Sequence, residues 1–355
     1  MRRTALLLLL WLAACDCRDG AGAVEVPPLV AAPPTEVVAL SVGRDFACAL
    51  DGAGTVGCWG PGPEARAETV DNLPPAVSIS VGGDRACAAT REGGVLCWGP
   101  PPLGTLSVLP GLDDAFAVSL GDGHACAALR SGRVACWGDN AVGQLGDGTT
   151  RFRAEPARVP GLVEIVALSL GAAHSCALRA DGTAACWGGY PQLEDFEGTE
   201  PGPEGERPEV PLASAPRAVP GLSDAVGVAA GLTVSCARRR DGAVACFRAF
   251  LGGTIELQPI PWVTDATALD VGAWGRCVAR ASGALACWEL TAPEGRRVAP
   301  SVIGTVDDAR LISVGVERAC VVSGRDHVAC FSAPGGGDLR TVPWPREADN
   351  EAEHR

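Results

Sequence analysis

The sequence predicts an all-β fold built from seven repeated antiparallel sheets, and three observations support this prediction. A cysteine, nine residues and a second cysteine occur seven times along the 355 residues. A glycine stands five residues before every first cysteine, and Trp or Phe follows every second cysteine. The repeats are short apolar runs separated by Gly, Pro and Asp-Gly, a pattern typical of strands and turns. A fixed interval of this kind is the mark of a repeat protein.

Each unit presents the same features in the same order. The glycines are Gly43, Gly82, Gly121, Gly171, Gly231, Gly272 and Gly315. The cysteine pairs are Cys48 with Cys58, Cys87 with Cys97, Cys126 with Cys136, Cys176 with Cys186, Cys236 with Cys246, Cys277 with Cys287, and Cys320 with Cys330. The aromatics are Trp59, Trp98, Trp137, Trp187, Phe247, Trp288 and Phe331, which we expect in the core between units. Units of about 40 residues occur as helix pairs or as four-stranded propeller blades, and the strand-like runs favour the sheet.

The cysteine spacing predicts a hairpin with the two cysteines opposed. Between Cys176 and Cys186, a three-residue loop at 180–182 places Gly182 where a left-handed residue is needed. Counting outward from this loop sets Cys176 directly across from Cys186. Opposed residues have Cβ atoms about 4.5–5.5 Å apart, close to the roughly 3.5–4.5 Å of a disulfide. One disulfide within each hairpin is therefore predicted, and seven pairs of reduced, buried cysteines are the alternative.

The first residues predict export from the cytoplasm. Arg2 and Arg3 precede a short apolar run, so residues 1–14 have the pattern of a secretory signal peptide. The end of this run, Leu-Ala-Ala before Cys15, resembles the bacterial lipoprotein signal, which implies cleavage before Cys15 and lipid attachment to it. We therefore expect a lipid-anchored protein of the bacterial cell envelope, in the periplasm or on the cell surface. An ordinary signal peptide followed by a structural Cys15 is the alternative.

The cysteine count agrees with this compartment, because disulfides persist where the environment is oxidising. Sixteen cysteines are present; seven pairs use fourteen, Cys15 is assigned to lipid, and Cys17 is left unpaired. Cys17 is either a free thiol or a site of intermolecular pairing.

Composition divides the rest of the chain into three parts, the second of which carries an insertion. Residues 15–36 are rich in Pro, Ala and Val and predict a tether; residues 37–345 contain the repeats; residues 346–355 form a charged tail. An insertion at 189–216 is acidic and rich in Pro and Gly, and is interpreted as a solvated loop or as a partner-binding loop.

The third unit carries the most specific motif. Its matching residues are Gly121, His124, Cys126, Gly132, Val134, Trp137, Asn140, Gly143, Gln144, Leu145 and Gly146. This pattern resembles the repeat of the regulator of chromosome condensation family, and the resemblance extends in weaker form over all seven units. It implies a seven-bladed β-propeller of four-stranded blades around a central channel. Either the last unit supplies its own fourth strand near 339–343, or a segment before Val37 completes the last blade.

The sequence predicts a non-catalytic binding protein. It contains no Walker loop, nucleophile elbow or metal-ligand motif, so no catalytic residue, metal or cofactor is expected, and His124 and His174 are assigned to packing or hydrogen bonding between blades. The formal charge of −13 without a basic patch argues against nucleic acid. A monomer that binds an unidentified protein or a cell-envelope polymer is expected. The alternatives are an enzyme inhibitor, since the family includes an exported propeller that blocks β-lactamases, and a carboxylate-based propeller enzyme. Guanine-nucleotide exchange, the activity of the nuclear relative, is disfavoured by export.

Overall fold

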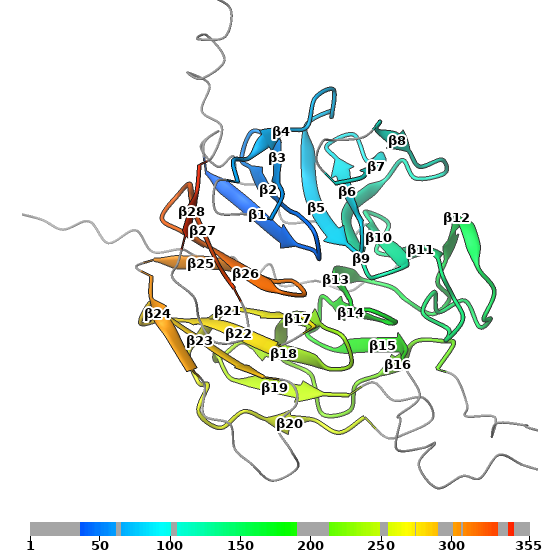
Figure 1. Cartoon of the computed structure of the whole chain (residues 1–355). Coiled ribbons are helices and arrows are strands. Elements are labelled where there is room, and N and C mark those ends of the chain that lie inside the picture. Colours follow the sequence, from blue (N-terminus) through cyan, green and yellow to red (C-terminus); the bar gives the residue numbers. More distant parts are fainter. Residues whose placement is uncertain are drawn as a thin grey trace, which may run out of the picture.

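The computed structural model describes residues 36–61, 65–100, 105–189, 213–248, 255–273, 275–289, 301–306, 308–332 and 340–343. Within these ranges every helix or strand is a β-strand, and the strands form seven four-stranded antiparallel sheets arranged as blades around a centre (Figure 1). The predicted all-β, seven-bladed propeller is confirmed.

Each blade is made of four consecutive strands. Blade one contains β1 (Val37–Val42), β2 (Ala47–Asp51), β3 (Val56–Trp59) and β4 (Glu68–Thr69). Blade two contains β5 (Ala76–Gly82), β6 (Arg85–Thr90), β7 (Val95–Trp98) and β8 (Ser107–Val108). Blade three contains β9 (Ala115–Leu120), β10 (His124–Leu129), β11 (Val134–Gly138) and β12 (Arg153–Arg158). Blade four contains β13 (Ile165–Leu170), β14 (His174–Arg179), β15 (Ala184–Gly188) and β16 (Arg217–Ala218).

The remaining three blades repeat the order. Blade five contains β17 (Ala225–Ala230), β18 (Ser235–Arg239), β19 (Val244–Phe247) and β20 (Gln258–Pro259). Blade six contains β21 (Ala266–Val271), β22 (Gly275–Arg280), β23 (Ala284–Glu289) and β24 (Ser301–Thr305). Blade seven contains β25 (Ala309–Val314), β26 (Arg318–Ser323), β27 (His327–Ser332) and β28 (Arg340–Val342).

The hairpin register agrees with the sequence prediction. Cys176 lies opposite Cys186 across β14 and β15, and Gly182 at the turn has φ +84°. The other six hairpins have the same register, and each blade contains one disulfide between its two middle strands. The seven disulfides join Cys48 to Cys58, Cys87 to Cys97, Cys126 to Cys136, Cys176 to Cys186, Cys236 to Cys246, Cys277 to Cys287, and Cys320 to Cys330. None of these seven bonds links two blades.

The core lies between the blades. The seven repeat aromatics are all buried, from Trp187 at 0% exposed to Trp137 at 9%. Trp98 of blade two packs with Phe46 and Val56 of blade one, and the other blade interfaces contain similar clusters. Burial of a large aromatic side chain stabilises the fold by a few kcal/mol, so each aromatic holds a blade against its neighbour.

The ring closes without exchange of a strand. Blade seven supplies its own fourth strand, β28, as one of the two alternatives predicted. The N–H of Val37 in blade one donates to the carbonyl of Arg325 in blade seven at 2.7 Å, just as the N–H of Ala76 in blade two donates to Gly54 in blade one at 2.9 Å. An ion pair between Arg310 Nη1 and Glu36 Oε1 at 2.6 Å adds to the closure.

Several sequence predictions concern residues outside the described part of the chain. These are the signal peptide 1–14, Cys15, Cys17, the tether up to residue 35, residues 190–212 of the insertion and the tail 346–355. In the part that is described, no helix has the length and apolar character needed to cross a membrane.

Candidate functional site: the central channel and the blade-three loop

The innermost strands of the seven blades surround a channel of about 620 Å³. Near its mouth stand the repeat glycines, here called the collar glycines: Gly43, Gly82, Gly121, Gly171, Gly231, Gly272 and Gly315. A Cβ atom on Gly171 would lie 2.0 Å from the carbonyl oxygen of Gly231, and one on Gly272 would lie 2.4 Å from that of Gly315. Only glycine allows the blades to approach this closely, which explains its presence in all seven units.

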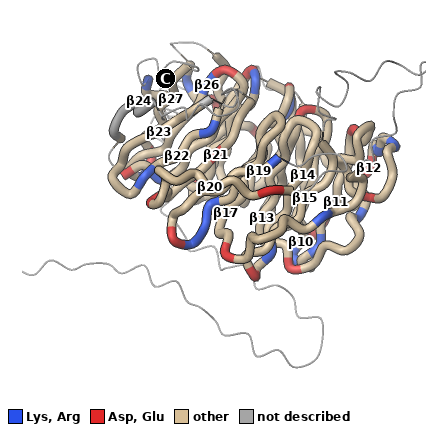
Figure 2. The backbone as a smooth tube through the Cα atoms, turned by 90° about the horizontal axis from the view of Figure 1, so that it is seen from below, with Lys and Arg blue, Asp and Glu red and all other residues tan. Residues whose placement is uncertain are grey.

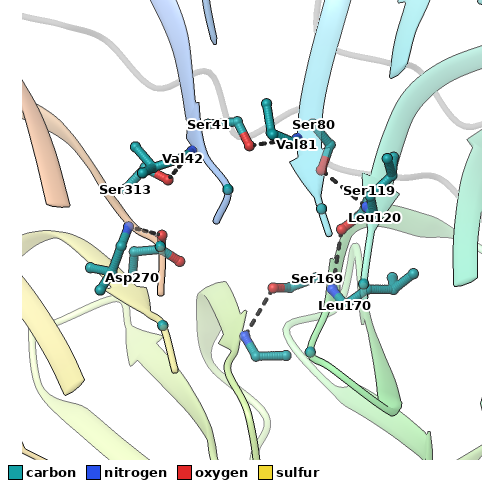
Figure 3. A pocket seen from close by; sticks show the side chains of 18 of the residues that line it. Ser41, Val42, Ser80, Val81, Ser119, Leu120, Ser169, Leu170, Asp270 and Ser313 are labelled. Atoms are coloured by element: carbon teal, nitrogen blue, oxygen red, sulfur yellow. Dashed lines mark hydrogen bonds between the residues drawn. The ribbon is translucent and has the colours of Figure 1, made fainter. Parts of the chain in front are cut away.

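Two residues before the collar glycine, five blades carry a serine (Figure 3). These ring serines are Ser41, Ser80, Ser119, Ser169 and Ser313. Each hydroxyl oxygen accepts the backbone N–H of the next blade's inner strand, as Ser41 does from Val81 at 2.8 Å and Ser80 from Leu120 at 3.0 Å. The last serine, Ser313, accepts from Val42 at 3.1 Å and so continues the pattern across the closure. These bonds satisfy N–H groups that an inner edge strand would otherwise leave open.

Blades five and six depart from this ring. Blade five has Ala229 and blade six has Asp270 where the other blades have serine. The Asp270 carboxylate accepts the N–H of Val314 at 2.7 Å, and it also accepts from the N–H of Val271 and the hydroxyl of Ser313. Asp270 therefore accepts the Val271 N–H, for which Ala229 of the preceding blade has no side-chain acceptor. Burial in the channel wall raises the pKa of Asp270 to about 6, although these hydrogen bonds oppose the rise.

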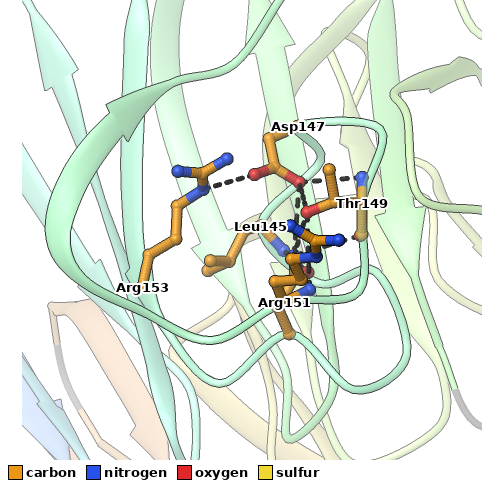
Figure 4. Close-up of polar contacts among 6 residues, drawn as sticks. Leu145, Asp147, Thr149, Arg151 and Arg153 are labelled. Atoms are coloured by element: carbon orange, nitrogen blue, oxygen red, sulfur yellow. Dashed lines mark hydrogen bonds and ion pairs between the residues drawn. The ribbon is translucent and has the colours of Figure 1, made fainter.

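A second distinctive region is the blade-three loop, residues 139–152, between β11 and β12 (Figure 4). Asn140 is 1% exposed; its side-chain oxygen accepts the N–H of Leu145 at 3.0 Å and its Nδ2 donates to the carbonyl of Thr149 at 3.0 Å. Asp147 accepts from the Thr149 N–H at 2.9 Å and from Arg153 Nε. Burial would raise the pKa of Asp147, but hydrogen bonds from Thr149, Arg153 and Asn140 hold it below its usual value. The loop is thus fixed by its own polar side chains.

The loop is also fastened to blade four. The carbonyl of Gln144 accepts Trp187 Nε1 at 2.9 Å and the Ser175 hydroxyl at 2.9 Å. Because Ser175 donates its only proton to Gln144, it must accept from His124 Nε2, which lies 2.9 Å away. His124 is therefore the Nε2–H tautomer, and its Nδ1 has no partner among the described residues.

The two histidines act as predicted, in hydrogen bonding between blades. His174 Nε2 lies 2.7 Å from the Ser235 hydroxyl, repeating the His124–Ser175 contact one blade further on. Burial lowers the pKa of His124 to about 3, with a smaller effect from His174, and burial lowers that of His174 to about 4. Both side chains are neutral at pH 7 and face the neighbouring blade.

The blade-three loop presents an exposed aromatic. Phe152 is 65% exposed, between Arg151 and Arg153. The described ends of the acidic insertion lie against the same loop: the Gly148 N–H donates to the Ser214 carbonyl at 2.8 Å. Figure 2 shows both basic and acidic positions in the region of β12. The structure therefore brings together a rigid loop, an exposed aromatic and the base of the insertion.

The structure adds functional candidates that sequence reasoning missed. The signal that could have found Asp270 and the ring serines is their shared repeat position, because five of the seven units have serine there. Phe152 had no repeat signal, because only blade three has the full loop. Within the described ranges no cluster of His, Cys, Asp or Glu has the arrangement of a metal site.

Comparison with known proteins agrees with these features. The sequence profile of the "Regulator of chromosome condensation (RCC1) repeat" matches residues 131–178, and a second profile of the same repeat matches 117–144. No curated protein matches the chain in sequence. Many solved structures share its fold.

Yeast RCC1 (Prp20), in a crystal structure in which Kap60 is bound to it, is 17% identical, with a TM-score of 0.61 over 89% of this chain and 82% of that one. Human WBSCR16 is 15% identical, with a TM-score of 0.63 over 83% of this chain and 88% of that one. The ectodomain of the Physcomitrella patens receptor kinase CR4 is 19% identical, with a TM-score of 0.53 over 84% and 73%. At these identities the likeness concerns the fold. The profiles place the RCC1 repeat in residues 117–178, within blades three and four, and the structural likeness shows that the propeller has the RCC1-like fold.

Proposed function

We propose that this protein is a membrane-anchored, extracytoplasmic scaffold that binds a partner protein through the blade-three loop. The observation that carries the proposal is Phe152, 65% exposed on a loop whose polar side chains are buried and bonded. Aromatic and arginine side chains dominate the energetics of protein interfaces. A loop that is already ordered loses little conformational entropy on binding, so the same contacts give higher affinity.

Two further observations support a binding role. The described residues that flank the insertion, which is acidic in sequence, lie beside this loop: the Gly188 N–H donates to the Ala213 carbonyl, and the Gly148 N–H donates to the Ser214 carbonyl. The RCC1-like fold is that of the yeast protein to which Kap60 is bound in its crystal structure. A scaffold of this kind needs no catalytic residue, which agrees with the neutral, structurally engaged histidines.

Site-specific photo-crosslinking in the native host tests the partner surface. A crosslinker at position 152 should give a discrete covalent product with a second protein. The matched control is position 108, because Val108 is 71% exposed on β8, the outer strand of a different blade, blade two. The proposed surface is wrong if position 152 gives no product, or if both positions give the same one.

Membrane fractionation tests the anchor separately. Lipid on Cys15 predicts that Cys15→Ala moves the protein from the membrane fraction to the soluble one, since the acyl chains supply the attachment. Cys17→Ala is the control and should leave the distribution unchanged. Unaltered membrane association of the Cys15 variant would refute the lipid anchor without affecting the partner surface.

A further inference from the structure

The central channel has the dimensions of a small-molecule site. Its volume of about 620 Å³ lies within the roughly 300–1,000 Å³ typical of ligand pockets. The wall alternates branched aliphatic residues, such as Leu40 and Ile79, with the ring serines. Each of the seven inner strands is paired within a four-stranded blade that contains its own disulfide, and the blades pack into a ring, so the cavity is formed before any ligand arrives.

Hydrogen-bond donors line one side of this cavity. Each ring serine accepts one N–H and still has a hydroxyl proton to give. In the described part of the chain, the hydroxyl protons of Ser41, Ser80, Ser119 and Ser169 have no acceptor. Ser313 differs, because its proton goes to the Asp270 carboxylate. Blades one to four therefore offer hydroxyl donors to the channel.

One negatively charged hydrogen-bond acceptor, the Asp270 carboxylate, faces these donors. Figure 3 places Asp270 across the channel from Ser119. Among the described residues that line the channel, the other charged side chains are Arg44 and Asp122, both exposed in the loops at the mouth. The Asp270 carboxylate is thus the one charged group in the wall, and the net charge of −13 further favours a cation over an anion.

We propose that the central channel binds a small polyhydroxylated cation, of the chemical class of an amino sugar, with its ammonium group against Asp270. The ammonium has three donors and no acceptor, which suits a carboxylate. The ligand's hydroxyl oxygens accept from the ring serines, and its C–H faces contact the aliphatic side chains. This site is separate from the blade-three loop, so the two proposals stand or fall independently.

Calorimetric titration of the mature chain with glucosamine and with glucose tests the charge preference. Glucosamine should bind about tenfold or more tightly than glucose, as a charged hydrogen bond implies. Asp270→Ser restores the residue of the other blades and should bring the two affinities together. Asp122→Asn, which removes a carboxylate at the mouth, should leave the preference intact.

Two more readouts separate this site from general acidity. An ammonium beside Asp270 lowers its pKa from about 6, so binding near pH 6, where the amine of the sugar is protonated, should release a proton and make the heat depend on the buffer. Ser119→Ala should weaken both sugars equally, and blade five shows that alanine is tolerated at this position. The proposal is overturned if glucosamine gives no heat up to about 10 mM, or if its preference survives in Asp270→Ser.

Discussion

Blades three and four differ from blades six and seven at the same two repeat positions. In blades three and four, His124 and His174 lie two residues before the first cysteine, and each contacts a serine of the next blade. In blade seven that position is Arg318, and in blade six Arg276 occupies the place of Ser175. Arg276 Nε and Arg318 Nε and Nη2 are buried without a hydrogen-bond partner among the described residues.

The difference shows which features specify the ring. Burial lowers the pKa of Arg276 to about 10, with a contribution from Arg248. The surroundings of this arginine therefore disfavour its charged form. Blades three and four nevertheless have the same strand order, the same disulfide and the same collar glycine as blades six and seven. The propeller therefore depends on features close to the backbone, and the side chains beside the first cysteine vary.

Among single substitutions, the largest effect should come from the feature that blades three and four share with blades six and seven. Gly171→Ala in blade four and Gly272→Ala in blade six should each lower the free energy of unfolding by about 3 kcal/mol or more, because the new Cβ meets a neighbouring carbonyl. Urea unfolding measures the loss. Gly227→Ala is the control, since a Cβ there has nothing within 4 Å. Collar variants as stable as this control would show that the blades can move apart.

A smaller effect should separate the two pairs of blades. Ser175→Ala removes the hydroxyl between His124 and Gln144 and should cost about 2 kcal/mol, because a buried N–H loses its partner. Arg276→Ser, at the same repeat position in blade six, should change stability by less than about 1 kcal/mol, because a poorly bonded buried charge is removed. Equal losses in urea unfolding would contradict the contrast between the two pairs of blades.

Acid should lower the stability mainly through blades three and four, which contain the two buried histidines. The pKa values of His124 and His174, about 3 and 4, lie below the usual value of 6.5, so the unfolded chain binds protons first. Stability should therefore fall as pH drops from about 6.5 to 4, by up to about 1.4 kcal/mol per pH unit for each histidine. His124→Phe, which copies Phe46 of blade one, should halve this slope. An unchanged slope would mean that His124 titrates normally.

Asp270 should give a smaller pH effect than the histidines, with the opposite sign. Its raised pKa means that the folded chain binds the proton first, so its contribution to stability is present near pH 4 and is lost as pH rises to about 6. Compared with Asp270→Ser, the wild-type chain should lose about 1–2 kcal/mol over this range, after allowance for water in the channel. Parallel pH curves for the two proteins would refute this assignment.

The hairpins were predictable because their determinants are local. Nine residues between two cysteines, with a glycine at a left-handed position such as Gly182, leave one simple pairing. The roles of the ring serines were not predictable, because each depends on an N–H of the next blade that is distant in sequence, from 40 residues for Ser41 and Val81 to 271 for Ser313 and Val42. Phe152 also escaped prediction, because exposure is decided by the fixed loop beneath it and not by its own neighbours in sequence.

The absence of an exchanged strand at the closure within the described chain has a consequence for how such a ring arises. At the junction between blades seven and one, as between blades one and two, the first N–H of an inner strand donates to a carbonyl in the hairpin turn of the preceding blade, although the acceptor Arg325 is shifted by one repeat position relative to Gly54. The position of the chain ends is therefore arbitrary from the viewpoint of packing. A gene in which the first repeat is moved behind the last encodes the same circle, so circular permutation and duplication of whole repeats need no matching change at the two termini.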